Sequence, residues 1–210
     1  MLEWHEYLEI LTAIIVIVDP FGLIPIFISI TADETEREKA RTAKVAVIAA
    51  AIVLIVSILA GGPLLRFFGI SIASFKVAGG ILIFLTAVSM INARISSSKN
   101  TPEETEEAVE KENVAVVPLA VPLLAGPAAI STVIIYSHKQ PGLAMKGFLI
   151  GSVVLVALGT WVLLRLSSAI SRKLGRTGLN NTTRLMGLIL AAIAIEFIAG
   201  GLLQLFPGWQ

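Results

Sequence analysis

The chain has 210 residues, of which 56% are apolar and only 15% are charged. Soluble domains are about half apolar and about a quarter charged, so this composition predicts an integral protein of a lipid bilayer. The net charge of +1 provides no basic surface for nucleic acid. The chain has no cysteine, which excludes disulfides, thiolate nucleophiles and metal sites built on cysteine.

Six intervals between charged residues are apolar and of about the length of a membrane-spanning helix, which requires about 20 residues. The first contains only Asp19 and the last only Glu196, whereas the other four carry no charge. We therefore predict an all-α, polytopic membrane protein with six transmembrane helices. The predicted spans are Ile10–Ile30, Val45–Leu65, Val77–Ala93, Val114–Ser137, Gly147–Leu164 and Leu185–Phe206.

The distribution of positive charge predicts how the chain is oriented in the cell membrane. The loops after the first, third and fifth spans contain 12 of the 16 Lys and Arg residues. Loops rich in these residues stay in the cytoplasm, so we expect both termini to be extracytoplasmic. The long loop at residues 94–113 is rich in serine and then in glutamate. We expect a cytoplasmic acidic linker there, between a first repeat at residues 1–93 and a second at residues 114–210.

The first and fourth spans each contain a run in which glycine and prolines interrupt the apolar sequence. Val18–Phe27 reads VDPFGLIPIF, and Pro118–Pro127 reads PLAVPLLAGP. The dipeptides Asp19-Pro20 and Gly126-Pro127 are typical of a helix start, because proline is suited to the first helical position and Asp can cap free N–H groups. We predict that both spans are broken at mid-membrane. The alternative is that the prolines only kink continuous helices.

The two halves of the chain have similar patterns. Each contains a broken span, an unbroken span and a span with an early glycine. Three spans is an odd number, so the second half must enter the membrane from the opposite side, which predicts two inverted three-helix repeats. The third and sixth spans align at an offset of 107 positions. Aligning Gly22 with Gly126 gives 104 for the breaks, which pairs Asp19 with Leu123.

We expect the two breaks to face each other and to form a substrate site. The N-termini of the restarting helices would offer free N–H groups and partial positive charge to a carboxylate. Freed backbone cannot face lipid, and its carbonyls can receive an ammonium group. The hydroxyls near the second break are weaker candidates, because such groups often bond their own backbone. The candidate substrate-binding residues are Asp19, Pro20, Phe21, Gly22, Ala125, Gly126, Pro127, Ala128, Ser131 and Thr132.

Asp19 and Glu196 are the only charged residues deep in a predicted span. Ionisable groups at that depth usually serve function, so both are candidates for ion coupling. The alternatives are a structural helix cap for Asp19 and a structural hydrogen bond between helices for Glu196. His5 and His138 both lie outside the spans, so we predict no metal site.

The chain resembles, over essentially its whole length, the MarC family of six-span membrane proteins, which includes small neutral amino acid transporters of the SnatA type. The resemblance rests on DPFGLIPIF from Asp19, on Pro118–Thr132, and on MGLILAAIA from Met186. It implies secondary transport of glycine, alanine and similar amino acids, coupled to a cation gradient. Relatives often have Asn at Asp19, Gln at Glu196 and Gly at Ala128. An amide can cap a helix but cannot carry a proton, so the resemblance favours the capping role of Asp19.

We therefore expect a transporter of small neutral amino acids that works by alternating access, is coupled to H⁺ or Na⁺ and needs no other cofactor. We expect no enzyme activity. The alternative from another class is an intramembrane hydrolase that uses Asp19 and Glu196 as a paired acid. A small-molecule exporter or a channel is a third reading. A homodimer is an open alternative to a monomer.

Overall fold

The computed structural model describes residues 4–32, 34–92, 124–139 and 142–209. Every regular element in these ranges is a helix, which confirms the predicted all-α class. Five of the described helical segments are long and apolar enough to cross a membrane, and Pro127–Ser137 is a shorter apolar helix. The acidic linker and the first part of the predicted fourth span, residues 114–123, lie outside the described residues.

The first span is broken as predicted. Helix α1 covers Trp4–Val18 and helix α2 covers Pro20–Ile30, with Asp19 between them. Proline occupies the first position of α2, where its missing N–H is not needed. The break therefore lies inside a stretch that is otherwise helical from Trp4 to Ile30.

The next two helices are bounded by local capping. Helix α3 covers Glu36–Phe67 and begins with a capping box between Thr35 and Glu38. It ends at Phe67 and is followed by Gly69, whose φ of 67° is left-handed and is therefore suited to glycine. Helix α4 covers Ile72–Ile91 and begins at Ser71, whose side chain accepts a hydrogen bond from the N–H of Ser74. Both helices begin several residues before the predicted spans, because these caps lie outside the apolar runs.

The second half of the described chain contains helix α6 at Pro127–Ser137, helix α7 at Leu143–Arg165 and helix α8 at Ser167–Leu205, followed by the 3₁₀ turn η2 at Pro207–Trp209. The predicted loop between the fifth and sixth spans is wrong, since Leu166 alone separates α7 from α8. Charged residues made this stretch look like a loop. They lie on a helix that bends at Gly175, where φ is 63°.

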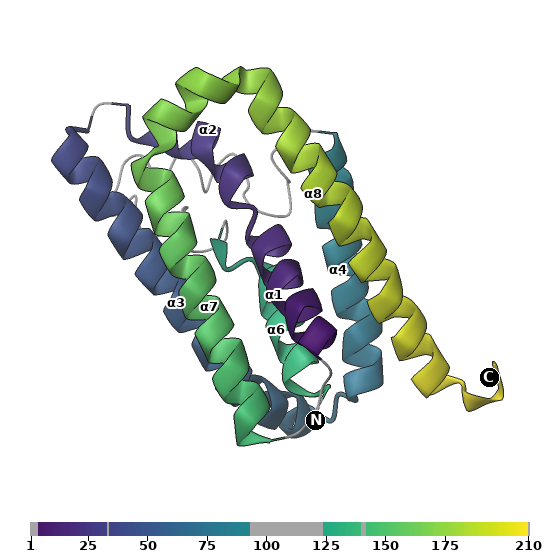
Figure 1. The fold of residues 1–210 in the computed structure, drawn as a ribbon. Helices are drawn as coiled ribbons and strands as arrows, with labels where there is room; N and C mark the ends of the chain where they lie inside the picture. Colours follow the sequence, from purple (N-terminus) through teal and green to yellow (C-terminus); the bar gives the residue numbers. More distant parts are fainter. Residues whose placement is uncertain (1–3, 33, 93–123, 140–141, 210) are drawn as a thin grey trace.

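The helices form two outer pairs with the shorter helices between them. In Figure 1, α3 lies beside α7 and α4 lies beside α8, while α1, α2 and α6 occupy the space between the pairs. The two termini lie at the same end of the bundle. Apolar side chains on the outward faces, such as Ile48, Ile52 and Val56 of α3, are exposed. Lipid would cover these faces in a membrane.

The same spacing relates several elements of the two halves. Helices α2 and α6 begin 107 positions apart, and so do α3 and α7. Helix α4 packs on α6 as α8 packs on α2. The predicted offset of 104, which aligns Gly22 with Gly126, differs by three positions from the spacing of these helix starts. At the spacing of the helix starts Asp19 pairs with Gly126, whereas the predicted offset pairs it with Leu123.

Candidate functional site

Asp19 holds the first break in an unusual conformation. Its φ of 46° and ψ of 63° are left-handed, and it is the one described residue other than glycine with a positive φ. Asp and Asn tolerate this region better than other side chains. Its Oδ1 accepts a hydrogen bond of 3.1 Å from the N–H of Gly22, and the side chain is 5% exposed. Asp19 is therefore a buried N-cap whose side chain supplies a hydrogen-bond acceptor to the start of α2.

The break deprives several carbonyl groups of their usual donors. Pro20 has no N–H for the carbonyl of Val16, and Pro25 has none for the carbonyl of Phe21. The N–H of Gly22 turns from the carbonyl of Val18 to the Asp19 carboxylate. Val16 and Val18 are buried, so these carbonyls make the inside of the break locally electronegative.

Thr183 also belongs to this region, although sequence reasoning did not include it. A Cβ added at Gly22 would overlap the Asp19 carboxylate and would lie 3.1 Å from Oγ1 of Thr183. The small glycine thus lets α8 approach the cap of α2. The only sequence signal for a site residue here is the polar run NNTT at residues 180–183. Such a run is also typical of the loop that the charge pattern predicts.

The second break lacks the side-chain cap that the first break has. Helix α6 begins at Pro127 after Gly126, whose φ of −71° and ψ of 171° are those of an ordinary N-cap. No side chain caps α6, so the first-turn N–H groups of Ala128 and Ala129 have no anionic partner among the described residues. Both alanines and Ala125 are buried. The positive end of α6 is therefore uncapped by any described side chain and is flanked by small, buried side chains.

The two hydroxyl candidates differ. The hydroxyl of Thr132 donates a hydrogen bond to the carbonyl of Ala128 at 2.8 Å. It therefore bonds the backbone of its own helix, as hydroxyls in membrane helices often do. The side chain of Ser131 is 5% exposed, and no hydrogen bond involves it within the described part of the chain. A Cβ at Gly79 would lie 3.3 Å from Oγ of Ser131. Ser131 therefore points at α4 with its hydrogen-bonding capacity available.

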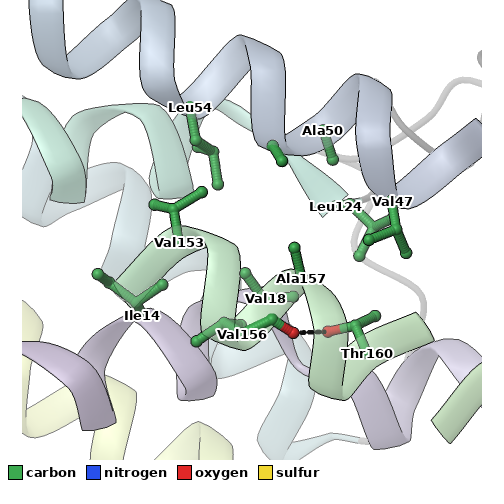
Figure 2. A pocket seen from close by; sticks show the side chains of 11 residues that line it. Ile14, Val18, Val47, Ala50, Leu54, Leu124, Val153, Val156, Ala157 and Thr160 are labelled. Atoms are coloured by element: carbon green, nitrogen blue, oxygen red, sulfur yellow. Dashed lines mark hydrogen bonds between the residues drawn. The ribbon is translucent and has the colours of Figure 1, made fainter. Parts of the chain in front are cut away.

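A small cavity lies beside both breaks. Its volume is about 20 Å³, and Val18, at the end of α1, and Leu124, just before Gly126, both line it. Figure 2 shows these two side chains with those of α3 and α7 around the cavity. Thr160 is the one polar side chain among the described lining residues, and its hydroxyl donates to the carbonyl of Val156 at 2.8 Å. Such a volume holds about one water molecule, so this cavity is too small for an amino acid.

Glu196 does not join this site. It lies 13 positions after Thr183 on α8, which is about 20 Å along a helix, and its side chain is exposed. The neighbouring Phe197 packs edge-on against Tyr136 with ring centroids 5.2 Å apart. Tyr136 in turn donates a 3.4 Å hydrogen bond to Glu9. Asp19 and Glu196 are therefore not a carboxyl pair.

Comparison with known proteins identifies the family. Residues 4–206 match the family described as "MarC family integral membrane protein". The "UPF0056 membrane protein YhcE" of Escherichia coli (strain K12) is 40% identical over 207 residues, covering 98% of this chain and 96% of that protein. A "UPF0056 membrane protein" of Aquifex aeolicus (strain VF5) is 35% identical over 210 residues and 98% of each chain. No solved structure matches. The chain described here belongs to the MarC family of integral membrane proteins.

Proposed function

We propose that this protein is a secondary transporter of small neutral amino acids in the cell membrane, built from two inverted three-helix repeats with both termini extracytoplasmic. The observation that carries the proposal is the difference between two equivalent helix starts. Asp19 caps α2 with a carboxylate, whereas Gly126, 107 positions later, leaves α6 without a side-chain cap. Among the described residues, no carboxyl group caps the second start as Asp19 caps the first.

The substrate carboxylate would supply that anion. It would accept hydrogen bonds from the N–H groups of Ala128 and Ala129, in the position that the Asp19 carboxylate takes at Gly22. A carboxylate is also favoured there by the partial positive charge of the helix terminus. Ser131, on the same helix, has a hydroxyl that can donate a further hydrogen bond.

The substrate ammonium group would lie on the side of the first break. Asp19 is anionic when ionised, and the carbonyls of Val16 and Val18 have lost their usual donors there. Ala125 and Ala128 are buried, so the closely packed surroundings of the second break leave little room for a substrate side chain. This arrangement favours glycine and alanine over larger amino acids.

Transport requires the breaks to open in turn to each side of the membrane. The cavity of about 20 Å³ beside the breaks is too small for an amino acid, so the helices around it must move for a substrate to bind there. Since α3 packs on α7 and α4 packs on α8, movement of one outer pair relative to the short helices would open the site. We assign coupling to H⁺ or Na⁺ at Asp19, because Glu196 lies about 20 Å along α8 from Thr183, which lies beside the first break.

Counterflow into liposomes tests the proposal. Purified protein is reconstituted with unlabelled alanine inside, and uptake of radiolabelled glycine or alanine is measured against protein-free liposomes. We expect uptake that depends on internal substrate, with little uptake of tryptophan. Uptake without internal substrate would indicate a channel. Absence of counterflow for every common amino acid would overturn the proposal.

The hydrolase reading has no support in the geometry. A paired acid needs two carboxyl groups that share a proton, whereas Glu196 lies about 20 Å along α8 from Thr183, the residue of α8 beside the Asp19 cap. An exporter of other small molecules would use the same breaks, and the counterflow assay separates it by substrate.

A further inference from the structure

A second cavity lies away from the breaks, at the ends of four helices. Its volume is about 440 Å³, and it is bounded by the C-terminal ends of α3 and α6 and the N-terminal ends of α4 and α7. Its polar side chains are Arg66, Ser137, His138 and Lys146, and the remaining described lining residues are apolar, glycine or proline. Cavities of this size hold small ligands, and the site described above does not use this one.

The charges around this cavity are all positive. Arg66 and Lys146 make no ion pair with any described residue, and no Asp or Glu is among the described residues that line the cavity. His138 is held in place, because its Nδ1 donates to the carbonyl of Ile134 at 2.9 Å. The other edge of its ring lies on Gly62, where an added Cβ would come 2.6 Å from Nε2. The cavity is therefore a fixed, cationic space without an internal counter-ion among those residues.

The helix ends add to this positive character. Gly142 and Leu143 of the cavity form the start of α7, which has no side-chain cap. At the end of α3, by contrast, the carbonyls are occupied, because the N–H of Ile70 donates to Leu65 at 2.9 Å and that of Gly69 to Arg66 at 3.1 Å. The positive end of α7 is thus open to the cavity, while the negative end of α3 is covered.

We propose that this cavity binds a phosphate oxyanion, in the form of the headgroup of an anionic phospholipid. Arg66 and Lys146 would contact the phosphate, and the apolar lining, including Ile58 and Leu65, would contact the glycerol and the first carbons of the acyl chains. A zwitterionic amino acid fits poorly, because no described carboxylate is there to receive its ammonium group. The position at helix ends matches the depth of headgroups in a bilayer.

Native mass spectrometry of the full-length protein tests this inference without measuring transport. The protein is released from mixed micelles that contain equal amounts of phosphatidylglycerol and phosphatidylcholine, and the lipids that remain bound are counted. We expect at least a tenfold preference for phosphatidylglycerol. The double variant Arg66→Gln/Lys146→Gln should lose that preference, whereas Arg66→Lys should retain it.

The matched control is Arg41→Gln/Lys44→Gln, which removes two exposed charges from the opposite end of α3. It should retain the preference, and equal loss in the control would overturn the proposal by showing a nonspecific charge effect. Equal lipid binding by the wild type and the Arg66/Lys146 variant would overturn it as well.

Addition of inorganic phosphate at 10 to 100 times the lipid concentration distinguishes the source. Retained lipid supports the headgroup, and displaced lipid would overturn the lipid assignment in favour of a soluble phosphate. Thermal unfolding in detergent checks that the variants are folded.

Discussion

Gly80 of α4 packs against the backbone of α8 in the same way as Gly187 of α8 packs against the backbone of α4. A Cβ at Gly80 would lie 3.0 Å from the carbonyl oxygen of Ala194, and a Cβ at Gly187 would lie 2.9 Å from that of Ala87. Each glycine is 107 positions from the other, as Ala87 is from Ala194. The two helices therefore cross with their backbones in close approach at two equivalent points, as small residues permit in membrane helices.

Substitution of either glycine by alanine should destabilise the protein by about 1–3 kcal/mol, because the added methyl group meets backbone atoms that cannot move independently. Gly80→Ala and Gly187→Ala should have similar effects on thermal unfolding in detergent. Gly151→Ala and Gly200→Ala are the controls, since no atom lies within 4 Å of a Cβ at either position. Wild-type unfolding temperatures for both test variants would contradict the close crossing.

Variants of Asp19 should separate the contribution of its helix cap from the contribution of its ionisable charge. Asp19→Asn should unfold like the wild type and still bind substrate, because Asn caps helices and tolerates left-handed φ. Asp19→Gly should cost only a few tenths of a kcal/mol. Asp19→Ala should cost about 2–3 kcal/mol, through a lost cap and a strained backbone, and should abolish counterflow. Normal transport by Asp19→Ala would show that the cap does not organise the site.

A carboxylate introduced at the second break should act as a tethered competitor. In Gly126→Asp, the new side chain would cap α6 as Asp19 caps α2, and we expect glycine counterflow to be lost while the protein stays folded. Gly126→Ala is the matched control and should retain counterflow if a Cβ fits there, whereas Gly126→Leu should abolish it by bulk. Full activity of a folded Gly126→Asp variant would exclude the start of α6 as the carboxylate site.

Gly22→Ala should disturb the first break without removing a polar group. The new methyl group would overlap the Asp19 carboxylate, so the carboxylate must rotate away from the N–H of Gly22. We expect a strong loss of counterflow. Thr183→Val retains the side-chain volume and removes only the hydroxyl; a reduced substrate affinity in Thr183→Val would add this residue to the site, and unchanged affinity would limit it to packing.

The coupling ion can be identified by imposing one gradient at a time on the liposomes. If Asp19 exchanges a proton, a pH gradient alone should drive accumulation of alanine in the wild type but not in Asp19→Asn. Accumulation that follows sodium, with no response to pH, would rule out proton coupling. Glu196→Gln should accumulate alanine like the wild type, because this side chain lies far from the breaks.

Much of this arrangement was visible in the sequence. Asp19-Pro20 and Gly126-Pro127 mark the helix starts correctly, because capping and the missing N–H of proline are local properties. The orientation of Glu196 was not predictable, since α8 is apolar on every side around it and has no polar face. Thr183 is not predictable as a site residue, because the charges near residues 172–184 are typical of a loop. Its neighbour in space, Gly22, is distant in the chain.

For the proposed transporter with two inverted repeats, the uneven capping of α2 and α6 has an energetic consequence. If the two halves had identical side chains, each would adopt the conformation of the other when the carrier changes from facing one side of the membrane to facing the other side. The two states of the empty carrier would then have equal free energy. In one half the helix start is capped by a side chain of the protein, whereas in the other it would be capped by the carboxylate of the substrate. This difference removes the equality of the two free energies. An empty carrier of this kind has a preferred resting direction, set by a single side chain.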